Sequence, residues 1–164
     1  MNMNNQRAKT KKESNAPRNF WMVVSDIESF NGTKDHGFEN YPLREEHRRK
    51  IQRIESGDRI LFYVESSKKF SATGFVTSSY REIAKGSWPW QLTNRWTYEI
   101  GVRSEVLLQE HEYIDAYQIA PRLEYVKRWA PEDWPLAFQG NLHLLPKADF
   151  YLLEEEMKKI QRSK

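Results

Sequence analysis

The sequence predicts an α+β protein, a small and mostly antiparallel β-barrel with helices packed at its periphery. Several strand-like segments follow one another without a helix between each pair, which argues against a doubly wound parallel sheet. Two other segments, 42–58 and 146–161, have apolar residues at helical spacing. The 164 residues, 38% hydrophobic and 30% charged, have the composition of a folded domain with its own core.

The basic charge is concentrated at the N-terminus. Residues 1–18 carry five basic residues and one acidic residue, a net charge of +4, whereas the whole chain carries +3, so residues 19–164 carry −1. Because residues 1–18 also contain few apolar side chains, we predict a disordered basic tail over 1–18 and a single domain over 19–164. The tail either attracts phosphates or is only solvated, and the sequence leaves both interpretations open.

The domain begins with a predicted strand over 20–25, "FWMVVS", whose two faces are both largely apolar. A long polar loop is predicted over 26–41. The segment 42–58 is then expected to form a helix, with Pro42 in its first turn and Gly57 at its end.

Further strands are predicted over 59–64 and 70–80, and Gly74 inside the second indicates a bulge or a close backbone approach. The remaining predicted elements are strands over 95–102 and 105–110, helical turns over 115–126, a short strand over 141–146, and a closing helix over 146–161. The closing helix places Phe150, Leu153, Met157 and Ile160 on one face.

The composition excludes several kinds of site. The chain has no cysteine, which rules out disulfides, thiolate metal ligands and cysteine nucleophiles. Its four histidines are not at metal-ligand spacing, and no Walker, dinucleotide-binding or GxSxG pattern occurs. We therefore expect no metal, no cofactor and no catalytic motif. With no membrane-spanning apolar run and no signal-peptide pattern, we expect a cytoplasmic location and no membrane partner.

Two of the six tryptophans are notable for their position. In "GSWPW", Trp88 and Trp90 flank a proline within an otherwise polar loop. Tryptophans in a loop are less often needed for core packing than tryptophans in strands. Trp21 and Trp96 lie at alternating positions of predicted strands and are expected in the core. We therefore interpret Trp88 and Trp90 as candidate ligand contacts.

Five segments, in order and at similar spacing, resemble the EVE domain family, which belongs to the PUA-like superfamily and is related to the YTH domains. They are "NFWMVVS", "IESGDRILFYV", "TGFVTSSY", "RWTYEIGV" and "FQGNLHLLPKADFYLL", and they run from about Asn19 to Leu153. The resemblance implies a PUA-like pseudobarrel with peripheral helices. It also implies binding of DNA or RNA, with a flipped-out and often modified base held between aromatic walls.

The resemblance also implies a set of base-pocket residues. They are Trp88 and Trp90 as the aromatic walls, Ser25, Asp26 and Ser29 as polar contacts after the first strand, and Phe30 where EVE members often carry a tryptophan. Many EVE members have Trp-Gly-Val before the first helix, and this chain has Tyr41-Pro42-Leu43 instead. Tyr41 can still stack on a base, but Pro42 removes a backbone donor, which bears on ligand preference.

These residue types suit the recognition of a base. A base that leaves its stack loses a few kcal/mol, and stacking on aromatic rings returns roughly 1–3 kcal/mol per base. Base identity then has to come from hydrogen bonds to groups such as Ser25 and Asp26. On the predicted helix, Arg44, Arg48 and Arg49 would hold phosphates, which position the strand without identifying its sequence.

Two other functions are compatible with the sequence. A PUA-like binder of structured RNA without a base cage would depend on Arg48 and Arg49 more than on the tryptophans. A small hydrolase acting on a nucleoside-like substrate would need a general base, for which Asp26 or Glu28 near His36 are the candidates.

Each candidate also has a structural interpretation. Asp26 would cap a turn, the arginine face would be a solvated helix surface, and Trp88 and Trp90 would be packing residues. Trp129 and Trp134 are expected to cap an end of the barrel.

Overall fold

The computed structural model of the protein describes residues 16–84 and 96–163. The strands are β1 (Phe20–Ser25), β2 (Asn40–Arg44), β3 (Arg59–Val64), β4 (Lys69–Glu82), β5 (Trp96–Leu107), β6 (Ile114–Asp115) and β7 (Leu142–Leu144). The α-helices are α2 (Ile27–Asp35), α3 (Arg48–Ile51), α4 (Ala116–Ile119) and α5 (Lys147–Arg162). Short 3₁₀ helices are η1 (Glu45–His47), η2 (Glu110–Glu112), η3 (Ala120–Arg122) and η4 (Pro131–Phe138).

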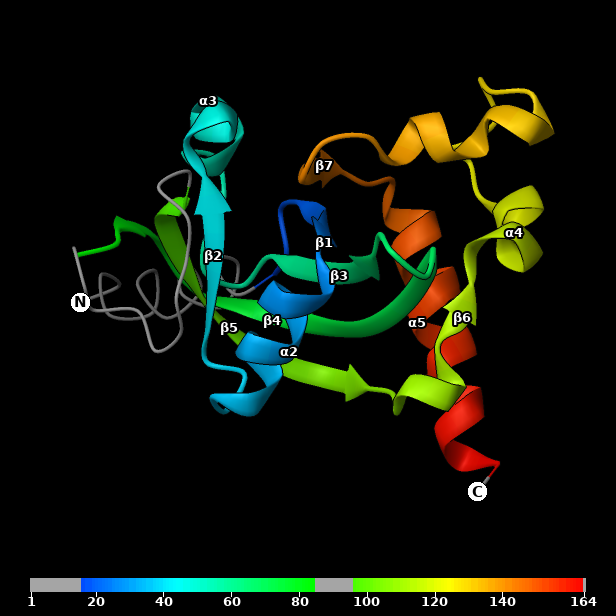
Figure 1. Cartoon of the computed structure of the whole chain (residues 1–164), viewed down its shortest axis with the longest axis horizontal. Helices are drawn as coiled ribbons and strands as arrows, with labels where there is room; N and C mark the ends of the chain where they lie inside the picture. The colour runs from blue at the N-terminus through cyan, green and yellow to red at the C-terminus, as the bar shows by residue number, and fades with distance from the viewer. Residues whose placement is uncertain (1–15, 85–95, 164) are drawn as a thin grey trace, which may run out of the picture.

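The strands form one mixed sheet that curls into a half-barrel (Figure 1). Its strand order is β2-β5-β4-β3-β1-β7, and β6 pairs with the beginning of β4. All pairings are antiparallel except that of β1 with β3, in which Phe20 lies opposite Arg59 and Ser25 opposite Val64. The predicted α+β class with a mostly antiparallel sheet and peripheral helices is therefore confirmed.

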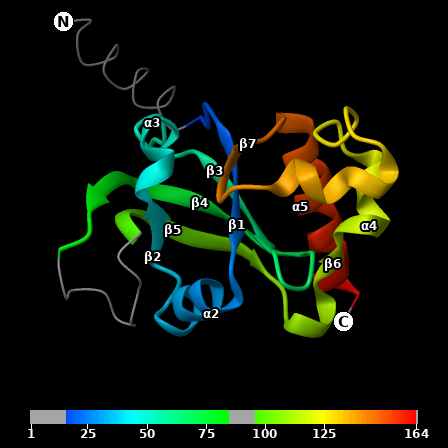
Figure 2. The ribbon, with the colours of Figure 1, turned by 45° about the horizontal axis from the view of Figure 1, so that its top comes forward.

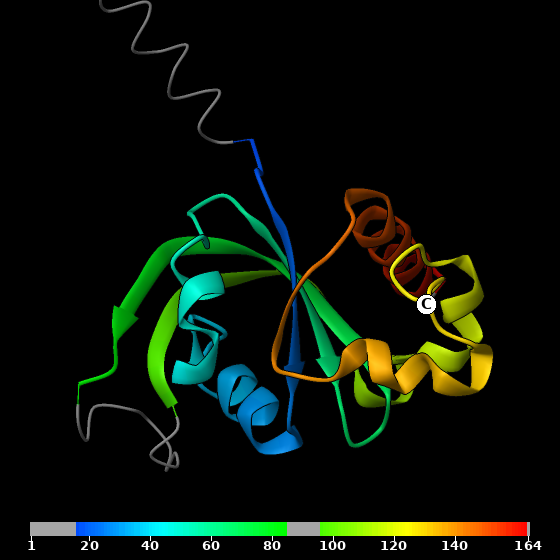
Figure 3. The same ribbon diagram turned by 90° about the horizontal axis from the view of Figure 1, so that it is seen from above.

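Helices cover both sides of β1. In the two turned views, α2 and α3 lie within the curl of the sheet, whereas α4 and α5 lie on the other side of β1 (Figures 2 and 3). Side-chain packing agrees with this arrangement, because Phe30 of α2 contacts Phe62 of β3 and Phe150 of α5 contacts Phe20 of β1. Every residue of β1 is buried, as the two apolar faces of this strand predict.

The tryptophans predicted to pack have different surroundings. Trp21 is fully buried, and its indole Nε1 donates a hydrogen bond to Asp58 Oδ2 at 2.9 Å. Trp96 is only half-buried, with the Arg44 guanidinium over its ring. Trp134 packs against the core, as expected of a capping residue, but Trp129 is 38% exposed and does not.

A buried ion pair holds α5 against the sheet. Arg59 Nη2 donates to Glu154 Oε2, and Thr73 Oγ1 donates to the same oxygen at 2.6 Å. The guanidinium lies between the rings of Phe75 and Phe150, at 4.0 and 4.7 Å from their centroids. Because both charged side chains are less than a tenth exposed, water contributes little to their solvation.

Two of the predicted elements are wrong. The segment 26–41, predicted as a loop, contains the nine-residue helix α2, which Asp26 caps. The predicted helix over 42–58 is broken up: Pro42 lies in β2, an edge strand, and only η1 and the single turn of α3 are helical. Proline is tolerated in an edge strand because its missing N–H faces away from the sheet.

Glycines behave as the sequence indicates at two positions. The register of β4 and β5 shifts at Gly74, and a Cβ atom there would collide with the carbonyl oxygen of Arg103. Gly57 has φ of 95°, a conformation that favours glycine, and it ends the segment before β3.

The predicted tail over 1–18 falls mostly outside the described residues. Its last three residues, 16–18, are described, and the division into a tail over 1–18 and a single domain over 19–164 stays a prediction. No helix within residues 16–84 and 96–163 is long and apolar enough to cross a membrane.

Candidate functional site

Two of the predicted pocket residues contact each other at the end of β1. Ser25 is the last residue of this strand, and its Oγ lies 2.5 Å from the hydroxyl oxygen of Tyr41 in β2, with either atom able to donate. Both side chains are buried. Burial raises the pKa of Tyr41 well above its ordinary value, so the phenol stays protonated. The pair therefore contains two O–H groups, of which their mutual bond uses one.

Asp26 and Ser29 form the N-terminal cap of α2. The Asp26 carboxylate accepts the backbone N–H of Ser29 at 2.7 Å and the Ser29 hydroxyl at 3.3 Å. Ser29 is buried, whereas Asp26 keeps part of its surface exposed. The capping role considered for Asp26 is thus real, and it fixes the carboxylate next to Ser25.

Phe30 is part of the hydrophobic core. Its ring is fully buried and makes contacts with the rings of Phe38, Phe62 and Tyr113, with centroids 5.8 to 6.3 Å apart. No face of this ring is open to a base in the structure. The ring instead fixes α2 against β3, which positions Asp26 and Ser29 at the end of β1.

The predicted aromatic walls, Trp88 and Trp90, lie outside the described residues. The residue at which the description resumes, Trp96, pairs with Arg44 of β2, and the Arg44 guanidinium carbon lies 4.7 Å from the centroid of its ring. Arg44 Nη1 is also 3.8 Å from the Glu46 carboxylate. Its Nε is buried without a hydrogen-bond acceptor, the one such side-chain atom among residues 16–84 and 96–163.

Arg48 and Arg49 are exposed on α3, next to Arg44 along the chain. Lys50, which follows them, donates from Nζ to the Leu142 carbonyl of β7 at 3.0 Å. Lys50 therefore links the short helix α3 to the sheet. The two arginines face solvent, where they are free to contact a phosphate.

Two histidines complete the contact between this segment and β7. His47 Nε2 accepts the backbone N–H of Asn141 at 3.2 Å, and His143 lies between the Tyr125 hydroxyl at 2.7 Å and the Gly140 carbonyl at 3.0 Å. Burial lowers the pKa of both His47 and His143. Burial therefore favours the neutral form of both rings, and His47 Nε2, as an acceptor, carries no proton.

A polar cavity of about 290 Å³ adjoins the end of β1. Its lining residues are Val24, Arg44, Glu46, Glu65, Phe138, Gly140 and Asn141. Asn141 is held in place by hydrogen bonds in both directions with the backbone of Val24. Glu65 and Asn141 are not among the residues predicted from the sequence, because their proximity depends on the β1–β3 and β1–β7 pairings and no local pattern indicates it.

The candidate hydrolase residues do not come together. Asp26 caps the beginning of α2, Glu28 lies in its first turn and His36 caps its end, so about 12–15 Å along the helix axis separates either carboxylate residue from His36. His36 Nδ1 is within 2.9 Å of the Gly32 carbonyl instead. Within residues 16–84 and 96–163 we find no group of three acidic or histidine side chains that could hold a metal ion.

Comparisons with known proteins identify the fold. The YTH domain of Mmi1 superposes with a TM-score of 0.65 at 7% sequence identity, covering 89% of this chain and 78% of that one. The YTH domain of Toxoplasma CPSF4 gives 0.63 at 18% identity, covering 88% and 90%. The YTH domain of Zygosaccharomyces rouxii MRB1, solved with N6-methyladenosine RNA, gives 0.57 at 16%, covering 87% and 90%.

The half-barrel is a YTH-type fold. The predicted relation to YTH domains is thus confirmed at the level of the fold, and the closer resemblance to the EVE family stays a prediction. No protein-family model and no curated protein matches the sequence.

Proposed function

We propose that this protein is an RNA-binding domain that holds one unstacked base at the carboxyl end of β1. The observation that carries the proposal is the direct contact of Ser25 with Tyr41, beside the capped Asp26, within a YTH-type fold. Several solved YTH neighbours are complexes with RNA, and one contains N6-methyladenosine. We infer the same class of ligand for this chain, with a methylated adenine as the first candidate.

The hydroxyl pair supplies the polar recognition in this proposal. One of the two O–H groups of Ser25 and Tyr41 donates to the other oxygen, so the second O–H is left to donate to a base nitrogen or carbonyl. Asp26 has two carboxylate oxygens, and its Oδ2 makes only the longer bond to the Ser29 hydroxyl. That oxygen can accept an exocyclic amine. A base that leaves these groups unpaired loses about 1–3 kcal/mol for each, which favours bases with the matching edge.

Stacking supplies the rest of the affinity. We propose that Trp88 and Trp90 sandwich the base, because the loop that carries them leads into β5 at Trp96, next to Arg44 of β2. Each stacked ring is worth roughly 1–3 kcal/mol, which offsets the extrusion of a base from its stack. A buried methyl group adds about 1 kcal/mol.

The phosphates of the same strand would lie along the arginines. Arg44 has an unpaired buried N–H at a cavity wall, so an anion there gains a charge-assisted hydrogen bond and solvates that group. Arg48 and Arg49 are exposed and would add attraction that depends on salt but not on sequence.

One observation favours a second candidate, RNA binding without a base cage. Ser25, Ser29, Phe30 and Tyr41 are all buried, so a base can reach them only if the site opens. In this second case Arg48 and Arg49 carry the binding and the hydroxyl pair has a structural role only.

A titration with matched oligonucleotides distinguishes the two. Single-stranded RNAs with one adenosine or one N6-methyladenosine, and the DNA equivalents, are titrated against the full chain by fluorescence anisotropy at two salt concentrations. The base-pocket proposal expects tighter binding of the methylated RNA. It also expects a loss of about 5- to 150-fold for Trp88→Ala and for Trp90→Ala, because about 1–3 kcal/mol of stacking is removed each time.

Two variants serve as controls for the titration. Arg49→Ala should weaken binding to all oligonucleotides alike and reduce the salt dependence. Tyr80→Phe, a conservative change of an exposed tyrosine in β4, should have no effect. Equal binding of methylated and unmodified RNA, unaffected by both tryptophan variants but weakened by Arg49→Ala, would contradict the base pocket and support the second candidate.

A further inference from the structure

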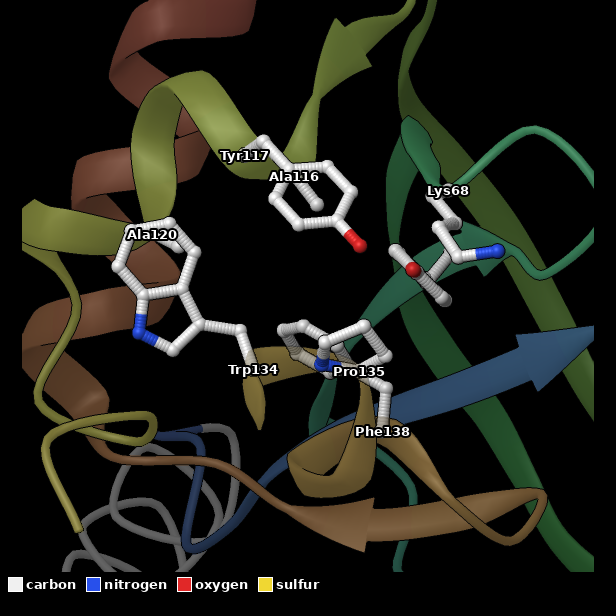
Figure 4. A pocket seen from close by; sticks show the side chains of 8 residues that line it. Lys68, Ala116, Tyr117, Ala120, Trp134, Pro135 and Phe138 are labelled. Carbon is white, nitrogen blue, oxygen red and sulfur yellow. The ribbon is translucent and has the colours of Figure 1, made fainter. Parts of the chain in front are cut away.

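A second cleft lies between η4 and α4, lined mainly by aromatic rings (Figure 4). Its lining residues are Tyr63, Lys68, Ala116, Tyr117, Ala120, Trp134, Pro135 and Phe138, and the adjoining hollow adds Glu65, Leu136 and Gln139. The hollow has a volume of about 210 Å³. Tyr117 and Leu136 at its rim are 46% and 40% exposed, so the cleft is accessible from solvent.

The rings form two pairs. Tyr63 stacks on Phe138 with centroids 4.8 Å apart, and Tyr117 lies 6.2 Å from Trp134. The hydroxyl of Tyr117 points toward the centre of the cleft (Figure 4). The rings and Pro135 enclose almost no free space between them, and the adjoining hollow of about 210 Å³ is too small for a folded element.

Two hydroxyl donors line this cleft, those of Tyr63 and Tyr117, and neither has an acceptor within residues 16–84 and 96–163. Burial raises the pKa of Tyr63, so its phenol remains a donor. Hydroxyl donors beside apolar rings are suited to a ligand that presents carbonyl oxygens but few N–H groups.

Two carboxylates act on the Tyr63 hydroxyl. Glu65 lines the hollow, and both Glu65 and Asp115 lie close enough to Tyr63 to contribute to the rise of its pKa. Lys68 is the one basic lining residue, and its nitrogen points away from the Trp134 ring (Figure 4). A phosphate backbone would be repelled here, whereas a basic side chain would be attracted.

This cleft lies on the opposite face of the sheet from the Ser25–Tyr41 pair. Side chains alternate between the two faces of a strand, and Tyr63 lies opposite Val24 in the β1–β3 pairing, one residue before Ser25 and Val64. Tyr63 therefore faces η4, while Ser25 faces Tyr41 on the other side of the sheet. The Ser25–Tyr41 pair and the Tyr117 side of the cleft can therefore be changed independently, whereas Glu65 and Phe138 line both the hollow and the polar cavity beside Arg44.

We propose that this cleft binds a proline-rich segment of a partner protein, in the polyproline II conformation and with a basic residue beside the prolines. Such a segment has exposed carbonyl oxygens and no N–H at its prolines, which matches the two tyrosine hydroxyls beside the aromatic rings. Proline rings pack on aromatic faces, and the preformed conformation keeps the entropic cost of binding low. The basic flank pairs with the carboxylates of Glu65 and Asp115.

The test uses the full chain and synthetic peptides. A fluorescent peptide made of a run of prolines with arginine at each end, capped at both termini, is titrated by anisotropy, next to one with glutamate at each end. We expect saturable binding of the arginine peptide and weaker binding of the glutamate peptide. Tyr117→Phe removes one donor and should weaken binding about 2- to 10-fold. Tyr117→Ala should weaken it further.

The matched control is Tyr151→Phe, because Tyr151 is similarly exposed but lies on α5. It should bind the peptide like the unchanged protein, and circular dichroism checks that each variant is folded. The proposal is overturned if the arginine peptide does not bind, if folded Tyr117→Ala binds it equally well, or if single-stranded RNA displaces it, since displacement would make the cleft a nucleic-acid site.

Discussion

Replacing Glu154 by leucine tests the ion pair that joins α5 to the sheet. The change removes the carboxylate that accepts from Arg59 and Thr73, and it leaves the Arg59 guanidinium in a position only 7% exposed. A buried charge that loses its partner costs about 3–5 kcal/mol. Since domains of this kind are stable by about 5–15 kcal/mol, the variant should lose a large part of its stability.

Urea unfolding followed by circular dichroism measures this loss. For a domain of this size each kcal/mol corresponds to about 2–4 °C, so the melting temperature of Glu154→Leu should fall by about 6–20 °C. The urea midpoint should fall without a change of slope. Lys158→Ala is the control, because Lys158 contacts the same carboxylate at 3.6 Å but is partly exposed, so its removal should cost less than about 1 kcal/mol.

The double variant Arg59→Met/Glu154→Leu decides whether the unpaired charge is the cause. If it is, removing both charges restores most of the stability, because an apolar pair of similar volume fits between the rings of Phe75 and Phe150. A double variant as unstable as the sum of its single changes would refute this reasoning and point to lost packing. Unchanged stability of the Glu154→Leu protein would also refute the reasoning.

Three further predictions concern stability. Gly74→Ala should lower the free energy of unfolding, measured by calorimetry, by about 1–3 kcal/mol, because the new Cβ collides with the carbonyl of Arg103. An unchanged free energy of unfolding would mean that the two strands can separate at this position. Asp149→Ala should lower the free energy of unfolding by about 1–3 kcal/mol and speed hydrogen exchange in the loop before η4, because this carboxylate accepts two backbone N–H groups at 2.8 Å. Unchanged hydrogen exchange in that loop would contradict the prediction. The pKa of His143 is lower in the folded protein than in the unfolded chain, so the unfolded chain takes up a proton first as the pH falls. The free energy of unfolding should therefore decrease as the pH drops below about 6.5. Urea midpoints measured from about pH 7 to about pH 5 should show this decrease, and it should be smaller in His143→Gln.

The sequence predicts the central strands well because the local composition of each strand indicates that it is buried. The segments 20–25 and 59–64 are apolar on both faces, and both are fully buried strands. The closing helix is predicted for a similar reason, since Phe150, Leu153 and Met157 recur at helical spacing and are all buried.

The region between these strands is predicted poorly. Helix α2 has few apolar residues and contains Gly32, so its hydrophobic periodicity is weak. The one sequence signal for this helix is its N-terminal cap, in which Asp26 precedes Ser29 and an acidic first turn. The opposite error arises over 42–58, where a helix-like pattern is overridden by pairing of β2 with β5.

The candidate site shows the same limit. Ser25, Asp26 and Tyr41 are identified by resemblance, and the structure brings Ser25 and Tyr41 into contact. The role of Phe30 as a core residue, and the proximity of Glu65 and Asn141, depend on pairings between distant strands. Such proximity has no local signature in the chain, which is why sequence reasoning misses it.

The position of β1 has a consequence for synthesis on the ribosome. Its partners are β3, which emerges soon afterwards, and β7, which is made after more than a hundred further residues. Until β7 leaves the exit tunnel, one edge of β1 has no strand beside it, and an open apolar edge invites pairing with other chains. Nascent chains truncated before Leu142 should therefore aggregate, whereas those that include β7 and α5 should be released folded.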